Sequence, residues 1–151
     1  MILEILRQAG CEDIRLQEPL SNHTTFRVGG PCRALALCRD AEAITQAVRM
    51  LAKAGVPFTV IGSGSNLLVS DLGWDGVVLC FQNPTERPEW DGVHVQVSGG
   101  VLLDSLVRES VEMGLDGLTF ASGLPGTIGG ALAGNAGAFG ECVSDRLVSL
   151  S

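Results

Sequence analysis

Two glycine-rich segments without a charged side chain constrain this chain of 151 residues more than any other feature. Residues 61–69 read Ile-Gly-Ser-Gly-Ser-Asn-Leu-Leu-Val and directly follow the strand-like residues 58–60. Residues 122–130 read Ser-Gly-Leu-Pro-Gly-Thr-Ile-Gly-Gly and continue to residues 135–137, Asn-Ala-Gly. Glycine allows positive φ and lets a ligand approach backbone N–H groups closely, and successive N–H groups form anion-binding nests. The first segment therefore predicts a cradle for nucleotide phosphates that uses amides rather than side-chain charge.

Composition limits the class of protein and its partners. A hydrophobic content of 46% and a length of 151 residues are typical of one globular domain with a real core. The net charge of −7, without a Lys/Arg cluster, argues against nucleic acid or an anionic membrane as partner. Residues 117–140 carry no charge, yet Pro125, Asn135 and eight glycines disfavour a membrane-spanning helix there. Residues 1–7 resemble a short amphipathic helix rather than a signal peptide, so we expect a cytoplasmic protein.

The cysteine and histidine positions predict neither a disulfide nor a metal site. The number of cysteines is odd and no Cys-x-x-Cys spacing occurs, which favours reduced thiols packed in the core. The two histidines, His23 and His94, lie at no metal-ligand spacing. We therefore expect five free thiols, at Cys11, Cys32, Cys38, Cys80 and Cys142.

Hydrophobic periodicity predicts alternating strands and helices. The expected strands are residues 14–17, 33–38, 58–61, 77–81, 93–97 and 147–151. The expected helices lie at residues 1–7, between the N-cap Asp40 and the terminating Gly55, and from Leu103 to Gly114. Residues 33–61 form a predicted βαβ unit, residues 82–92 a predicted loop, and an apolar strand at the C-terminus suggests a chain cut within a larger fold.

Two familiar phosphate-binding motifs do not fit the first segment. Gly62 and Gly64 match the start of the dinucleotide fingerprint Gly-x-Gly-x-x-Gly, but Leu67 stands at the third position and no acidic residue follows about 20 residues on. No Gly-Lys-Ser/Thr of a Walker A loop occurs. For one loop considered alone, a tight turn that binds no ligand remains the alternative to a phosphate cradle. The presence of the second glycine-rich loop disfavours that alternative.

Three motifs resemble the UDP-N-acetylenolpyruvoylglucosamine reductase (MurB) family. They are residues 22–30, with Asn-His-Thr-Thr-Phe and Val-Gly-Gly, residues 61–69, and residues 123–140, with Gly-Leu-Pro-Gly-Thr-Ile-Gly-Gly-Ala and Asn-Ala-Gly-Ala-Phe-Gly. The resemblance covers nearly the whole chain in the family's order. It implies an α+β (α/β) fold, the FAD-binding fold of the vanillyl-alcohol oxidase type. In that fold a small parallel βαβ subdomain and a mixed-sheet subdomain with helices clasp FAD.

The resemblance also implies domains and site residues. The first subdomain would span about residues 1–82 and the second, truncated, about 83–151, with the C-terminal substrate-binding domain absent. Residues 62–66 would hold the FAD pyrophosphate, and residues 122–130 and 135–137 would line the ribityl chain and isoalloxazine. The cofactor contacts carried over are Ile61, Gly62, Ser63, Gly64, Ser65, Asn66, Leu67, Ser122, Gly123, Pro125, Gly126, Thr127, Ile128, Gly129, Gly130, Asn135, Ala136 and Gly137. Thr25 and Phe26 are further candidates, with core packing as the alternative, and Phe139 stands where the family commonly has Tyr.

The activity implied is reduction of UDP-N-acetylenolpyruvoylglucosamine to UDP-N-acetylmuramate in cytoplasmic peptidoglycan synthesis. Non-covalent FAD would take hydride from NADPH and pass it to the enolpyruvyl double bond of the UDP-sugar. The family's catalytic Arg, Ser and Glu would lie beyond the last motif matched, so we assign no catalytic residue and expect the chain alone to be inactive. Two alternatives stay open: an FAD-dependent oxidoreductase of the same fold acting on another substrate, and a non-catalytic nucleotide-binding module.

Overall fold

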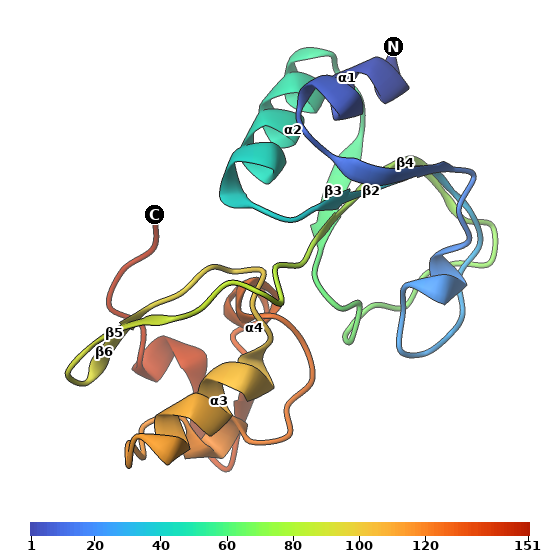
Figure 1. The fold of residues 1–151 in the computed structure, drawn as a ribbon. Coiled ribbons are helices and arrows are strands. Elements are labelled where there is room, and N and C mark those ends of the chain that lie inside the picture. The colour runs from blue at the N-terminus through green and yellow to red at the C-terminus, as the bar shows by residue number, and fades with distance from the viewer. The chain divides into compact units, whose positions relative to one another are not determined.

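The computed structural model describes residues 1–151 and divides the chain into two compact units, Met1–Asn83 and Pro84–Ser151 (Figure 1). The first unit is a four-stranded sheet with two helices. The second is built from two longer helices, short 3-10 turns and two small hairpins. The predicted combination of helices and strands is therefore present, and each unit has its own hydrophobic cluster.

The sheet of the first unit is mixed, with the strand order β1-β2-β4-β3. Strand β1 (Glu12–Leu16) runs antiparallel to β2 (Cys32–Cys38) at one edge. Strand β4 (Trp74–Phe81) pairs in parallel with both β2 and β3 (Phe58–Ile61). The predicted βαβ unit is thus present, but β4 lies between its two strands. The carboxyl ends of β2, β3 and β4 consequently meet at one edge, where open α/β sheets bind ligands.

Helices α1 (Ile2–Gln8) and α2 (Ala41–Lys53) cover one face of this sheet (Figure 1). The predicted start and end of α2 are confirmed. The Asp40 carboxylate accepts a hydrogen bond of 2.7 Å from the Ala43 N–H, a cap that contributes about 1 kcal/mol. Gly55 then adopts a φ of +65°, and the N–H of Val56 reaches the carbonyl of Leu51 at 3.0 Å, which closes the helix.

The opposite face of the sheet is covered by loops instead of helices. Buried Leu35, Ile61 and Val78 form its apolar cluster, against which Leu20 and Leu67 pack from two connecting segments. One segment, residues 17–31, contains the 3-10 turn η1 (Leu20–Asn22), and the other, residues 62–73, follows β3. Burial of this face therefore draws the two segments onto the same side of the sheet.

The second unit has α3 (Leu103–Glu112) and α4 (Ile128–Ala133) at its centre. Its strands pair only as two antiparallel hairpins, β5 (Glu89–Asp91) with β6 (His94–Gln96) and β7 (Gly137–Ala138) with β8 (Glu141–Cys142). The 3-10 turns η2 (Thr119–Ala121) and η3 (Val143–Asp145) complete it. Leu106, Val107 and Phe120 form the centre of its core. As predicted, α3 ends before Gly114, which has a φ of +76°.

Two sequence-based predictions in the second unit are wrong. The predicted loop at residues 82–92 contains β5, whose Trp90 pairs with Val95 and donates a 2.7 Å hydrogen bond to Glu109. Two flanking prolines concealed this strand, because they suppress the local strand pattern. The predicted strand at residues 147–151 has no ladder partner, and Val148 is 80% exposed. Apolar sequence alone does not make a strand, since a strand requires a hydrogen-bonded neighbour.

No helix in this structure combines the length and the apolar character needed to cross a membrane. The uncharged segment at residues 117–140 folds as η2, a loop, α4 and β7.

The five cysteines are all free thiols, and they differ in exposure. Cys11, Cys32, Cys38 and Cys80 are buried, while Cys142 is partly exposed. The Cys11 and Cys38 sulfurs lie 3.5 Å apart, and this contact, together with burial, raises the pKa of Cys38. Burial likewise raises the pKa of Cys80. The hydrogen bond with Cys38 lowers the pKa of Cys11, but burial keeps reagents from its sulfur. Since a thiol must be both deprotonated and accessible to react, all four buried thiols should react slowly in the folded protein.

We therefore expect thiol titration of the native protein to show one fast-reacting cysteine per chain, Cys142. Titration in denaturant without reductant should show all five. The Cys142→Ser variant should lose the fast phase and keep four thiols on denaturation. Two or more fast thiols in the native protein, or three or fewer in denaturant, would contradict the burial described above.

Candidate functional site

The loop at residues 62–66, called here the 62–66 loop, follows β3 at the carboxyl edge of the sheet. Gly64 lies at its centre, is buried, and has a φ of +64°, which side chains rarely adopt. A Cβ built on Gly64 would lie 1.9 Å from the main-chain oxygen of His23. Glycine is required there for two reasons, the backbone conformation and the close approach of another chain segment.

Three further contacts fix the loop through its carbonyl oxygens. The Gly64 carbonyl accepts from the Thr25 N–H at 3.2 Å, and the Ser65 carbonyl accepts from the Thr25 hydroxyl at 3.3 Å. The Gly62 carbonyl accepts from the Gln82 side-chain amide at 3.2 Å. Because these contacts engage acceptors, they do not consume the N–H groups that a phosphate would need. This polarity fits an anion-binding nest.

A polar cavity of about 430 Å³ borders the loop. Its lining brings together three parts of the first unit, which are the segment after η1, the start of the 62–66 loop and the end of β4. The lining residues are Asn22, His23, Thr24, Thr25, Arg27, Gly62, Ser63, Cys80 and Gln82. Thr25 is exposed and Phe26 is 61% exposed, so the alternative of core packing is wrong for both.

Arg27 is the one Arg or Lys side chain of that lining, and the sequence motifs did not single it out. It adopts a φ of +54° and lies within the motif at residues 22–30. The motif was visible in the sequence, but only the fold brings it to the 62–66 loop, which is about 40 positions further along. An arginine at this place adds a charged donor to an otherwise neutral set of groups.

The ends of the first predicted segment have a different environment. Ile61 and Leu67 line a separate, mostly apolar cavity of about 290 Å³, together with Leu20, Trp74 and Val78. Ile61 is 8% exposed and belongs to the apolar cluster on the loop-covered face of the sheet. These two residues therefore anchor the loop in the core while residues 62–63 border the polar cavity.

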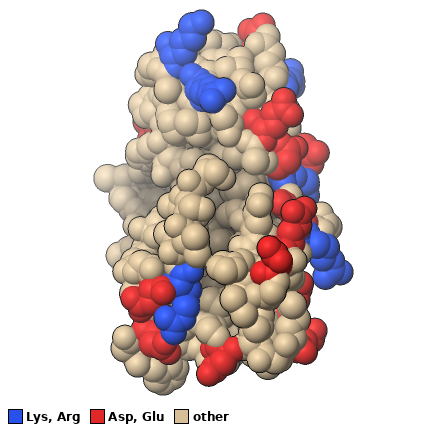
Figure 2. Space-filling model, turned by 90° about the vertical axis from the view of Figure 1, so that its left-hand side faces the viewer, with Lys and Arg blue, Asp and Glu red and all other residues tan.

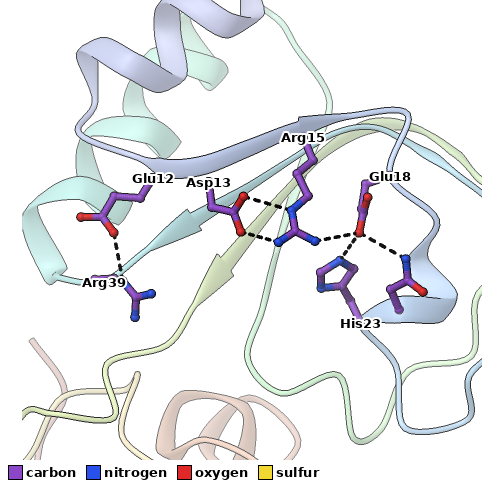
Figure 3. Close-up of polar contacts among 7 residues, drawn as sticks. Glu12, Asp13, Arg15, Glu18, His23 and Arg39 are labelled. Carbon is purple, nitrogen blue, oxygen red and sulfur yellow. Dashed lines mark hydrogen bonds and ion pairs between the residues drawn. The ribbon is translucent and has the colours of Figure 1, made fainter.

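A carboxylate holds the segment that carries these contacts (Figure 3). Glu18 Oε1 accepts from His23 Nε2 at 2.8 Å, from Arg15 Nη1 at 3.2 Å and from Asn22 Nδ2 at 3.3 Å. A carboxylate oxygen only accepts, so the histidine Nε2 carries the proton. These hydrogen bonds, that of His23 foremost, lower the pKa of Glu18 despite its partial burial. Asp13 binds the remaining nitrogens of Arg15.

The second glycine-rich segment, residues 122–130, is tied by its backbone to residues 99–103. The N–H of Gly129 donates to the Gly99 carbonyl at 2.8 Å, and the N–H of Ile128 donates to the Val101 carbonyl at 2.8 Å. The Gly130 N–H is occupied by the hydroxyl of Thr127, the buried N-cap of α4. The N–H groups of Ser122 and Gly123 also have partners, the Thr119 carbonyl at 3.1 Å and the Asp104 carboxylate at 3.4 Å. Hydrogen bonds within the protein thus engage the N–H groups of five predicted contact residues, and a cofactor would meet these residues by shape and not through those amides.

Residues 135–137 follow α4 directly. Asn135 has a φ of +45°, and the next N–H, of Ala136, reaches the Ala131 carbonyl at 2.8 Å, so Asn135 ends the helix. Its side-chain oxygen accepts from the Ser144 N–H at 3.1 Å. Phe139, in the turn between β7 and β8, is 94% exposed. The structure therefore gives Asn135 a local structural role besides the predicted cofactor contact.

A family model described as FAD binding domain matches residues 32–151. This range includes β2 to β4, both glycine-rich segments and the whole second unit. The chain belongs to this FAD-binding domain family. The residues at 18–31 that hold the 62–66 loop lie just before the matched range, so the family match says nothing about them.

Curated relatives carry the name UDP-N-acetylenolpyruvoylglucosamine reductase. The relative from Bacillus licheniformis is 41% identical over 147 residues, and that from Clostridioides difficile is 36% identical over 148 residues. These alignments cover 97% and 98% of this chain but 48% and 49% of the relatives. The chain spans about half the length of the curated relatives it matches.

Solved structures confirm the expected FAD-binding fold. The reductase (MurB) from Thermus caldophilus has a TM-score of 0.70 and 32% identity, with 88% of this chain and 47% of that chain covered. A chitooligosaccharide oxidase has a TM-score of 0.55 and 20% identity, with coverage of 75% and 25%. The second similarity concerns the fold alone, because identity this low carries no information about substrate.

The Gly64→Val variant should lose FAD binding. Its Cβ cannot coexist with the His23 carbonyl 1.9 Å away, so the loop must separate from residues 23–25. The matched control is Gly55→Val, because Gly55 has nearly the same φ, +65°, and a Cβ added there would meet nothing within 4 Å. A left-handed backbone costs each variant about 1–2 kcal/mol, so both should lose similar stability for that reason.

FAD fluorescence titration and thermal melts separate the two variants. We expect Gly55→Val to bind FAD as the unmodified chain does. Unimpaired FAD affinity in Gly64→Val would contradict the assignment of the 62–66 loop.

Proposed function

We propose that this chain binds FAD non-covalently and is the cofactor-binding part of an NADPH-dependent reductase that acts on UDP-N-acetylenolpyruvoylglucosamine. The observation that carries the proposal is the 62–66 loop, held by its carbonyls beside a polar cavity with one arginine. Family membership and the reductase relatives support the choice of FAD over other nucleotides. The family's reaction would be a cytoplasmic step of peptidoglycan synthesis.

The residues of the polar cavity suit a diphosphate. Backbone N–H groups of residues 62–66 would donate to the phosphate oxygens, with the Ser63 hydroxyl as a further donor beside them. Arg27 would add one charge-assisted hydrogen bond. A site built mainly from neutral amides accommodates an anion within a chain of net charge −7.

We propose the second glycine-rich segment as a further set of cofactor contacts. Within residues 122–126, Gly123 has a φ of +77° and open space around a Cβ position, which leaves room for a cofactor beside its backbone. Residues 127–130 and 135–137 would contribute small surfaces that allow close approach of a flat ring. In this role the engaged amides of Ile128 and Gly129 keep the shape of the segment constant.

FAD would supply the redox chemistry, which is hydride transfer between a nicotinamide and a substrate double bond. The chain's own residues would bind and orient it. Surface charge supports a small-molecule role over nucleic acid, because Lys and Arg are few and interspersed with acidic side chains on the face seen in Figure 2.

Titration of the purified chain with FAD and with riboflavin tests this proposal. We expect FAD to bind more tightly than riboflavin, because riboflavin lacks the phosphates that the 62–66 loop would hold. Because the chain alone is expected to be inactive, the FAD-loaded chain should show no NADPH oxidation that depends on UDP-N-acetylenolpyruvoylglucosamine. Equal affinity for FAD and riboflavin, or no flavin binding, would contradict the proposal.

The Arg27→Ala variant should weaken FAD binding by about fivefold, the size typical of one exposed ion pair. Lys53→Ala is the control, because it removes the same charge from the end of α2, outside the cavity lining. Affinity measured at low and at high salt should converge for the unmodified chain and Arg27→Ala, since salt screens exposed charges. An Arg27→Ala affinity equal to that of Lys53→Ala would remove Arg27 from the site.

A further inference from the structure

We propose that Glu18 is a positioning residue for the 62–66 loop, acting through His23 and Asn22. This inference rests on the proposed FAD-binding role of that loop. Glu18 makes none of the hydrogen bonds that fix the loop. It binds Asn22 and His23, at the start of the neighbouring segment that contacts the loop.

Residues 23–25, called here the seat of the loop, contact the 62–66 loop directly. The His23 main-chain oxygen occupies the place where a Gly64 side chain would begin. Thr25 binds two successive loop carbonyls, those of Gly64 and Ser65, with its N–H and its hydroxyl. A displacement of residues 23–25 therefore changes the backbone geometry of the loop directly.

Glu18 fixes this seat at its N-terminal end. Its Oε1 accepts from the side chains of His23 and Asn22, at 2.8 and 3.3 Å. The Glu18 side chain is 13% exposed and that of His23 is 20% exposed, so water competes little for this contact. Hydrogen bonds to a charged group are also the stronger kind.

Glu18 itself is anchored to the sheet. Its main-chain carbonyl accepts from the Cys32 N–H at 2.9 Å, at the start of β2. Arg15 of β1 donates to its carboxylate and is held in turn by Asp13 (Figure 3). The carboxylate thus connects two strands of the sheet to the seat of the loop.

The main-chain bonds of η1 define what Glu18 adds. The N–H of Asn22 binds the Pro19 carbonyl, and the N–H of His23 binds the Leu20 carbonyl. These bonds keep the turn folded without Glu18. Loss of the carboxylate should therefore leave the fold intact and loosen the orientation of the turn, which is the behaviour of a positioning residue.

The test compares Glu18→Ala, Glu18→Gln and a matched control, Glu12→Ala, with the unmodified chain. Glu12 lies on β1 and pairs with Arg39 at the surface, so its removal changes the net charge equally and leaves the seat alone. We expect Glu18→Ala to raise the dissociation constant for FAD about tenfold, as for loss of a charged hydrogen bond. Riboflavin affinity should not change, and Glu18→Ala should keep a single cooperative thermal unfolding transition, as Glu12→Ala does.

Glu18→Gln should recover most of the FAD affinity, because its amide oxygen can still accept from His23 and Asn22. A purely structural role would lower the affinities for FAD and riboflavin together, and that outcome would overturn the proposal. Unchanged FAD affinity in Glu18→Ala would do so as well.

Amide hydrogen exchange of the protein without flavin tests the positioning independently of the proposed function. Glu18→Ala should speed exchange of the Thr25 amide, which donates to the Gly64 carbonyl, while the amides of α2 keep their protection. Unchanged exchange of the Thr25 amide would refute the positioning role even if FAD binds. Absence of FAD binding by the unmodified chain, with faster exchange of the Thr25 amide in Glu18→Ala, would refute the proposed function alone.

Discussion

The close approach of Gly64 to the His23 main-chain oxygen is the constraint on which the proposed phosphate site depends. Only a residue without a Cβ can make this approach and also hold a φ of +64°. The contact lets Thr25 bind the carbonyls of Gly64 and Ser65, so the loop is fixed from its acceptor side. Contacts to the carbonyls leave the opposite polarity of the backbone for an anion, which is how the proposed phosphate site would be compatible with an acidic chain.

The two glycine-rich segments look alike in sequence but use their backbones differently. The contacts that hold the 62–66 loop engage carbonyls, whereas at the start of α4 the N–H groups of Ile128 and Gly129 donate to residues 99–101. A Cβ on Gly129 would lie 3.0 Å from the Gly99 oxygen, so this glycine is needed for close backbone contact within the protein. The same residue type thus permits close backbone contact in both units, beside the proposed anion site in one and within the internal packing in the other.

Structural features were predictable from the sequence where their physical cause lies within a few residues. Asp40 begins α2 and Gly55 ends it because capping depends on atoms a few residues away. The failures have non-local causes. The strand β5 exists through pairing with β6, and residues 147–151 lack such a partner. The position of β4 between β2 and β3 likewise follows from sheet pairing, which local periodicity does not encode.

The sequence by itself determined that residues 62–66 are a neutral, glycine-rich turn after a strand, and its motifs pointed to the FAD-binding family. Tertiary structure decided which groups surround that turn. Glu18, His23 and Arg27 come from a segment about 40 positions earlier, and burial of the loop-covered sheet face brings it to the 62–66 loop. Backbone conformation is set by neighbouring residues, whereas hydrogen-bond partners and charges at a site are set by packing between distant segments. For that reason the loop was predictable, and the carboxylate that holds its seat was not.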